Sequence, residues 1–334
     1  MRESYFLPIE KPSFFCYNHY SCADGIVRAN AKDNFPALLC VKYINCVYRE
    51  EELRHQFIIS MFDAWWTHQK IIRKQQINLR KSTIRQLNID LVLMIKRCLM
   101  LDSYILSCCN RKYLIPDADT DHELFYFVLV GYDDTKKEFT LHGQTSLDEF
   151  ACYRIGYDDF VEAMLNNSNS HINLELYNYN AAASMELDLP NIAIELDDYL
   201  QSSNSRQHYT ADKLYGFRAI EALAKKIEVD LENLGPEVGN SYLHKFAMHK
   251  RFMKERVEYL AMQGVIDKKW IIDAEKVFQL ANTAKAIGEK CYQSNDFSDT
   301  SQLASNMRNT IEIEQRYLPN VLLEIASILI KDNS

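Results

Sequence analysis

Glycine and proline are scarce in this sequence, with nine Gly and seven Pro in 334 residues. Both residues mark tight turns and interrupt regular elements, so their scarcity favours a mostly helical protein with few tight turns. No segment approaches the ~18 consecutive apolar residues that a membrane-spanning helix needs. The first eight residues, MRESYFLP, contain no apolar stretch of the kind found in signal peptides. We therefore expect a cytoplasmic protein that does not enter a membrane.

Paired cysteine motifs and an excess of basic charge are also missing. The nine cysteines are odd in number and show no Cys-x-x-Cys spacing, so we expect reduced thiols and neither a disulfide framework nor a zinc ribbon. The 38 basic residues are outnumbered by 46 acidic ones, and the net charge of −8 argues against a general nucleic-acid-binding protein. A hydrophobic content of 47% predicts a packed core, and the length allows two domains of ordinary size.

The most informative stretch runs from residue 103 to residue 165. Apolar runs rich in β-branched and aromatic residues cover 103–109, 123–134 and 138–143, with short polar segments between them. An amphipathic segment follows at 153–165, and the run at 171–178 alternates between apolar and polar residues. This pattern predicts an antiparallel sheet of at least four strands over 103–178, packed on a helix that begins near Cys22.

The rest of the chain reads mainly as helix. Residues 35–48 allow a helix followed by a strand, residues 49–80 are charged with a helical pattern, and Ser82 opens an amphipathic helix that reaches Leu99. After about residue 185, strand patterns disappear. We expect helices there at 191–203, 210–230, 241–263, 268–293 and 301–331, the last interrupted at Pro319. The sequence thus predicts an α+β domain over 1–185 and an all-helical domain over 186–334.

Several short motifs occur in an order that points to a known family. They are Asp102-Ser-Tyr-Ile-Leu, Tyr113-Leu-Ile-Pro, Val-Leu-Val-Gly-Tyr-Asp-Asp134, Arg154-Ile-Gly-Tyr-Asp-Asp-Phe-Val-Glu-Ala, Tyr215-Gly-Phe-Arg-Ala-Ile-Glu-Ala-Leu, Met248-His-Lys-Arg-Phe-Met and Arg256-Val-Glu-Tyr-Leu. With these motifs the chain resembles proteins related to the N-terminal domain of butirosin biosynthesis protein H. That family is papain-like and is associated with natural-product gene clusters. The resemblance covers most of the chain and implies a papain-like antiparallel sheet domain with an N-terminal helix.

The resemblance also implies acyl transfer, in which a cysteine thiolate takes an acyl group from a carrier-protein thioester and passes it to an amine. Cys22 is our candidate nucleophile, because Ser21 can cap a helix there and a helix N-terminus favours a thiolate. Cys16 is its competitor, and both can instead be small buried residues. His122 is the candidate base, just before the central strand. His19 can polarise a substrate group or brace the loop, and we favour bracing.

Two positions depart from the family's pattern. The catalytic histidine of that pattern opens the central strand, where this chain has Phe125 or its neighbour. His142 stands about where the orienting aspartate falls, and Gln144 is a conceivable substitute. The spacing of His19, His122 and His142 matches no known metal site, so we expect neither a metal nor a cofactor.

The predicted function is therefore that of an acyltransferase or thioesterase-like accessory protein of natural-product biosynthesis, of the non-ribosomal peptide type. Its partners would be an acyl or peptidyl carrier protein and a small-molecule acyl acceptor. The basic run 70–81 is either a solvated helix face or a dock for such an acidic carrier. The alternative is a catalytically degenerate papain-like module that binds a carrier protein or peptide.

Overall fold

The protein is an α+β structure that divides into two compact units. Unit 1 comprises Met1–Phe35 and Asp63–Ser184, and unit 2 comprises Pro36–Phe62 and Met185–Ser334. The chain therefore leaves unit 1 for an early segment of unit 2 and then returns. In the computed structural model the described residues are 2–12, 18–31, 35–40, 44–51, 54–59, 71–114, 124–144, 149–183, 186–205 and 213–332.

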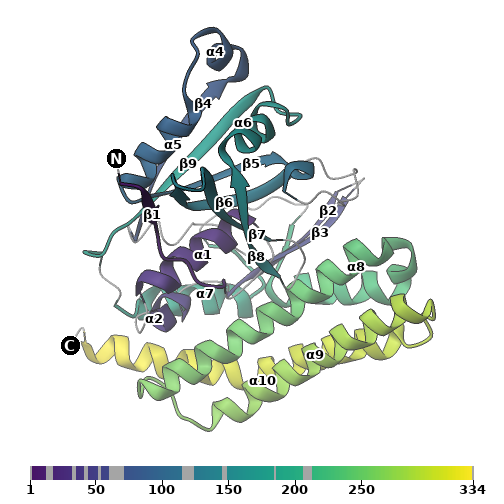
Figure 1. Cartoon of the computed structure of the whole chain (residues 1–334). Coiled ribbons are helices and arrows are strands. Elements are labelled where there is room, and N and C mark those ends of the chain that lie inside the picture. Colours follow the sequence, from purple (N-terminus) through teal and green to yellow (C-terminus); the bar gives the residue numbers. More distant parts are fainter. Residues whose placement is uncertain are drawn as a thin grey trace. The chain divides into compact units, whose positions relative to one another are not determined.

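Unit 1 is built on an antiparallel sheet (Figure 1). The order is β4-β9-β5-β6-β7-β8, and β1 pairs separately with β6. The strands are β1 (Ser4–Phe6), β4 (Ile72–Arg80), β5 (Ser103–Asn110), β6 (Leu124–Asp133), β7 (Glu138–Gln144), β8 (Phe150–Gly156) and β9 (His171–Tyr179). This arrangement confirms the sheet predicted for 103–178.

Helices cover both faces of this sheet. They are α1 (Asn18–Ala31), α4 (Lys81–Gln86), α5 (Leu91–Met100) and α6 (Tyr157–Leu165). The amide of Asn30 in α1 donates to the hydroxyl of Tyr104 on β5 at 3.1 Å, which places α1 on the face of Tyr104. The rings of Phe127 and Phe139 meet that of Phe160 in α6 at 5.8 and 4.9 Å. Because side chains alternate along a strand, α1 and α6 lie on opposite faces.

Unit 2 combines a small sheet with long helices. Its sheet has the order β10-β2-β3, from β2 (Cys46–Glu51), β3 (Arg54–Ile59) and β10 (Lys213–Tyr215). Its helices are α2 (Phe35–Cys40), which begins at the unit boundary, α7 (Leu189–Leu200), α8 (Gly216–Met262), α9 (Trp270–Ser294) and α10 (Thr300–Asp332). The apolar stripes of α8, α9 and α10 pack on one another and form most of the core of this unit.

The helix α8 joins two of the predicted helices across a kink. Asp230 and Gly235 have non-helical backbone angles, and Gly235 has a φ of +71°, which glycine adopts without steric cost. Pro236 follows directly, where a proline suits the start of the next helical segment. The predicted helices 210–230 and 241–263 correspond to the two arms. By contrast, Pro319 lies inside a continuous α10, so the expected interruption there is wrong.

The helical prediction for 49–80 is also wrong, because the described parts of this stretch form strands. Residues 46–51 pair with 54–59 as a hairpin, and Ile77 and Leu79 of β4 lie opposite Leu174 and Ile172 of β9. Pairing with strands distant in sequence outweighs the local helix preference of the charged residues.

Two further differences concern helix length and the composition of unit 2. The helix expected over 82–99 is divided into α4 and α5, because Asn88 has a φ of +49° and Asp90 caps α5 by accepting from the Leu93 N–H at 2.8 Å. The region after residue 185 is mainly helical but includes strand β10, which the all-helical expectation did not contain. Strand β10 forms because β2, from early in the chain, offers it a pairing edge.

Candidate functional site

Cys22 lies inside α1 and is buried. The helix begins at Asn18, so Ser21 is a residue of the helix and the expectation that it caps the N-terminus is wrong. The Cys22 side chain is 2% exposed. Burial raises the pKa of the Cys22 thiol far above its usual range, so the thiol is neutral at physiological pH. A thiolate is the reactive form of cysteine, and this environment disfavours it.

The predicted histidine partners of this thiol lie wholly or partly outside the described residues. His122 and the competing Cys16 both fall outside the described residues. His19 belongs to the first turn of α1, but its side chain is outside the described part. Among the side chains that are described, no hydrogen bond joins the Cys22 thiol to an imidazole. Of the predicted catalytic residues Cys22, His122 and His19, only Cys22 has a described side chain, and its thiol is buried.

Strand alternation identifies the β6 position that faces α1. Tyr104 contacts α1, and Leu106, two residues on, shares its face and pairs with Val128 of β6. Tyr126 shares that face too, since it lies two residues before Val128. Tyr126 is 46% exposed at the start of the strand. Phe125 points to the opposite face and is buried. The position expected for a catalytic histidine on the α1 face is therefore occupied by a phenol.

Phe125 has a structural role on the α6 side of the sheet. Its ring meets that of Tyr153 edge-on at a centroid distance of 5.3 Å. A Cβ added to Gly143 would lie 2.4 Å from the same ring, so this glycine makes room for it. Phe125 is core, and it does not replace a catalytic group within the site.

His142 and Cys152 lie directly opposite each other on β7 and β8. His142 also pairs with Val128, so both side chains are on the α1 face. Burial lowers the pKa of His142, which keeps the imidazole neutral at pH 7, and its ring stacks on Phe150 at 5.5 Å. Cys152 is exposed and is a free thiol. Cys152 was not singled out from the sequence; the signal that could have found it is the register of the β7–β8 hairpin, which places His142 and Cys152 opposite each other.

The described part of the basic run 70–81 forms strand β4 and the start of α4, and two of its lysines, Lys74 and Lys81, already have partners. Lys74 makes an ion pair of 2.7 Å with Glu175 on the neighbouring strand. Lys81 is buried and donates to the backbone and side-chain oxygens of Asn167 at 2.8 and 2.7 Å. Burial lowers the pKa of Lys81. The helix expected for this run is wrong, because it forms a strand, whereas most of its side chains are exposed as expected for a solvated face. The basic residues left for an acidic partner include Arg73 and Arg80.

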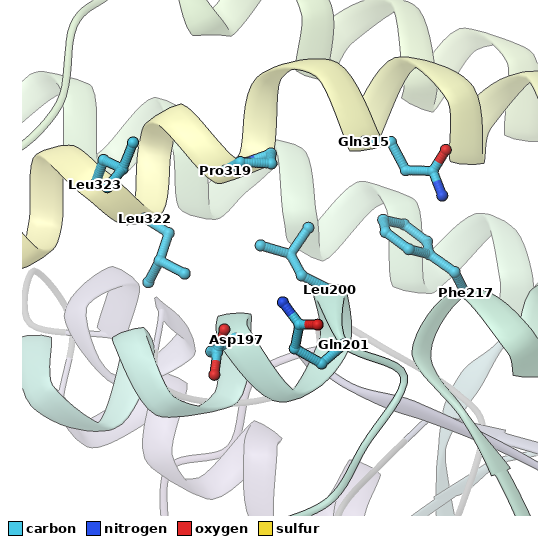
Figure 2. A pocket seen from close by; sticks show the side chains of 8 residues that line it. All are labelled: Asp197, Leu200, Gln201, Phe217, Gln315, Pro319, Leu322 and Leu323. Atoms are coloured by element: carbon cyan, nitrogen blue, oxygen red, sulfur yellow. The ribbon is translucent and has the colours of Figure 1, made fainter.

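Unit 2 contains a pocket of ≈ 370 Å³ between α7, α10 and the first turn of α8 (Figure 2). It is lined by Asp197, Leu200, Gln201, Phe217, Gln315, Pro319, Leu322 and Leu323. Most of these side chains are apolar, and the polar ones are one carboxylate and two amides. The volume falls within the range of ~300–1,000 Å³ that is usual for small-molecule sites.

A fully buried polar network lies next to this pocket. Lys250 of α8 forms an ion pair of 2.5 Å with Glu314 of α10, and both side chains are 0% exposed. Tyr199 of α7 donates to Glu314 at 2.6 Å and accepts from Lys250 at 2.7 Å. The ring of Phe217, which lines the pocket, is 4.7 Å from the ring of Tyr199. The network therefore braces one wall of the pocket.

His249 is buried beside this network. Its Nε2 atom is 2.8 Å from the carbonyl oxygen of Ile44, and burial lowers the pKa of the imidazole well below its usual range. The structure places both His249 and Lys250 in the core of unit 2, where they join α8 to other elements. These contacts are consistent with a structural role.

No protein-family model matches the chain, and no curated protein is significantly similar to it. In the described part of the chain, no cluster of three or more His, Cys, Asp or Glu side chains is suited to hold a metal ion. Each described helix is also too short or too polar to cross a bilayer.

Proposed function

We propose that unit 1 is a papain-like module that binds an acyl or peptidyl carrier protein, or a peptide, without forming an acyl-enzyme at Cys22. The observation that carries this proposal is the burial of Cys22, whose side chain is 2% exposed and whose thiol pKa is raised. A carrier thioester must reach the sulfur for acyl transfer, and the sulfur must be ionised when it attacks. Neither condition is met at this position.

A second observation that supports the proposal is the residue at the β6 position that faces α1. Tyr126 stands there, and its phenol is a much weaker base at pH 7 than an imidazole. A cytoplasmic location belongs to the same proposal. It is supported by the eight described cysteines, all of which are free thiols.

A second candidate function is acyl transfer through Cys22, with His122 as base and His19 beside it. The observation that favours it is the position of α1, which lies against β6, β7 and β9 of an antiparallel sheet. In that reaction the thiolate would attack the thioester carbonyl and expel the carrier thiol. An amine or water would then attack the acyl-enzyme and release the cysteine. The reaction requires a rearrangement that exposes Cys22.

One experiment separates the two functions. The full chain is incubated with an acyl-carrier thioester and analysed by intact mass, while binding of the same carrier is measured by fluorescence anisotropy. The binding module predicts saturable binding, no acyl adduct, and unchanged binding by Cys22→Ala. Acyl transfer predicts an adduct that Cys22→Ala abolishes.

Two further outcomes would change the assignment in different ways. An adduct that survives Cys22→Ala but is lost in Cys152→Ala would move the chemistry to the exposed thiol opposite His142. Absence of binding, both to the carrier and to a peptide panel, would exclude the binding module itself.

A further inference from the structure

The pocket of unit 2 is lined by five apolar side chains, one carboxylate and two amides. Figure 2 shows Asp197 and Leu322 toward one end of the pocket and Phe217 and Gln315 toward the other, with Leu200 between them. The apolar side chains come from three helices, so they present a surface on which an apolar group can be enclosed from more than one side. Carbon-rich walls of this kind bind the apolar body of a ligand.

Asp197 contributes a carboxylate, and no lysine, arginine or histidine among the described residues forms an ion pair with it. The buried cation behind the Phe217 wall is already paired, since Lys250 is bound by Glu314 and Tyr199. An exposed carboxylate next to apolar surface attracts a cation, and the attraction is stronger where the ligand itself excludes water.

One wall of the pocket, formed by Phe217, is held in place by the buried network behind it. Phe217 packs against Tyr199, and Tyr199 is fixed at its hydroxyl by both Glu314 and Lys250. A side chain fixed in this way loses little conformational freedom when a ligand binds, which favours binding. The other lining side chains are half-buried or exposed, so the ligand enters from the surface and Phe217 forms the fixed end of the site.

We propose that this pocket binds a small amphipathic amine. The ammonium group lies at Asp197, the apolar body lies along Leu200 and Leu322 toward Phe217, and the amides of Gln201 and Gln315 hydrogen-bond polar substituents. The size of the pocket restricts the ligand to a small molecule. The proposal rests on residues of unit 2 alone and does not depend on the function proposed for unit 1.

The test compares three probes that differ only in their head group. Binding of 4-phenylbutylamine, 4-phenylbutyrate and 4-phenyl-1-butanol to the full chain is measured by isothermal titration calorimetry at low ionic strength. The amine is expected to bind saturably with one site, and more tightly than the alcohol, while the carboxylate is expected not to bind. Raising the salt concentration should weaken binding of the amine only.

Two variants assign the effect to the pocket. Asp197→Asn keeps the shape of the side chain and removes its charge, and it should weaken binding of the amine roughly fivefold, as expected for loss of one partly exposed ion pair. Glu232→Gln removes the same charge from an exposed position of α8 outside the pocket and should leave binding unchanged. Thermal unfolding of both variants confirms that they fold.

Four results would overturn the proposal. The first three are absence of saturable binding of the amine at millimolar concentration, equal binding of amine and alcohol, and binding of the amine that Asp197→Asn leaves unchanged. Binding of the amine that Asp197→Asn and Glu232→Gln weaken equally would also overturn it, because the effect would then come from overall charge.

Discussion

Replacing Lys250 with methionine should lower the free energy of unfolding of unit 2 by about 3–5 kcal/mol. The Lys250 and Glu314 side chains are both 0% exposed and lie 2.5 Å apart. Without the lysine, the only donor to Glu314 among the described residues is the hydroxyl of Tyr199, and this bond reaches Oε2. Its Oε1 atom already has no hydrogen-bond partner within the described part of the chain. An uncompensated buried carboxylate is costly, whereas methionine preserves most of the apolar contacts of the lysine stem.

The measurement is urea unfolding followed by far-UV circular dichroism, which reports mainly on the long helices. The double variant Lys250→Met/Glu314→Leu completes a mutant cycle. Because it removes both charges, it should recover much of the loss seen in the single variant. The cycle thereby separates the cost of an unpaired charge from the cost of altered packing.

An exposed ion pair in the same unit provides the matched control. Lys290 and Asp299 lie 3.3 Å apart with side chains 71% and 43% exposed. Lys290→Met should therefore change stability by less than about 1 kcal/mol. Two results would refute the reasoning that burial makes the ion pair important. One is a loss of stability in Lys250→Met that is as small as the loss in Lys290→Met, and the other is a double variant that is less stable than Lys250→Met.

The remaining predictions concern a thiol, a histidine and a helix contact. Limiting iodoacetamide at neutral pH, followed by peptide mapping, should label Cys152 well before Cys22, and preferential labelling of Cys22 would contradict the burial on which the proposed function rests. Burial lowers the pKa of His249 in the folded protein, so below the imidazole's unperturbed pKa of ~6.5 only the unfolded chain takes up a proton at this residue. The free energy of unfolding should therefore be at its full value above that pH and lower by about 1.4 kcal/mol at pH 5.5. Urea titrations at pH 7.5 and 5.5 should show this loss in the wild type and a smaller one in His249→Gln; equal losses would exclude this histidine as the cause. Gly239→Ala should lower the free energy of unfolding by about 1–3 kcal/mol, measured as a lower urea midpoint, because the new Cβ would lie 1.9 Å from the Tyr292 hydroxyl oxygen. That hydroxyl donates to the backbone carbonyl of Leu231, and an unchanged midpoint would show that the Tyr292 side chain moves away at no cost.

The sheet of unit 1 and the long helices of unit 2 were predictable because their signals are local. Residues 103–110 and 124–133 are apolar runs rich in β-branched and aromatic residues, residues 171–179 alternate between apolar and polar, and short polar turns separate several of the strands. The helices after residue 188 carry apolar stripes at helical spacing, which any packed helix needs. The helix-then-strand reading of 35–48 agrees with α2 and the start of β2. Strands 54–59 and 72–80 and the end of 46–51 were missed because they lie in a stretch whose charged residues suit a helix equally well and whose strand pairing depends on the tertiary structure.

The candidate-site residues also divide into those that local sequence patterns identify and those that only the strand register identifies. Composition and motif order led to Cys22, Phe125 and His142 as residues to examine. Whether a side chain reaches α1 depends on strand register, and a shift of one residue reverses the face, which is why Tyr126 and not Phe125 occupies the position of interest. Register also brought Cys152 opposite His142, a pairing to which the sequence reading assigned no function.

The sequence by itself determined the class of the protein, the order of most elements and the apolar faces that each must bury, since these follow from composition and periodicity. Only the tertiary structure decided that Cys22 is buried, that Lys250 meets Glu314 across two helices, and that Asp197 opens onto an apolar pocket. Burial and ion pairing depend on which distant segments pack together. That choice is made by the sum of many weak contacts over the whole chain, and no local pattern encodes it.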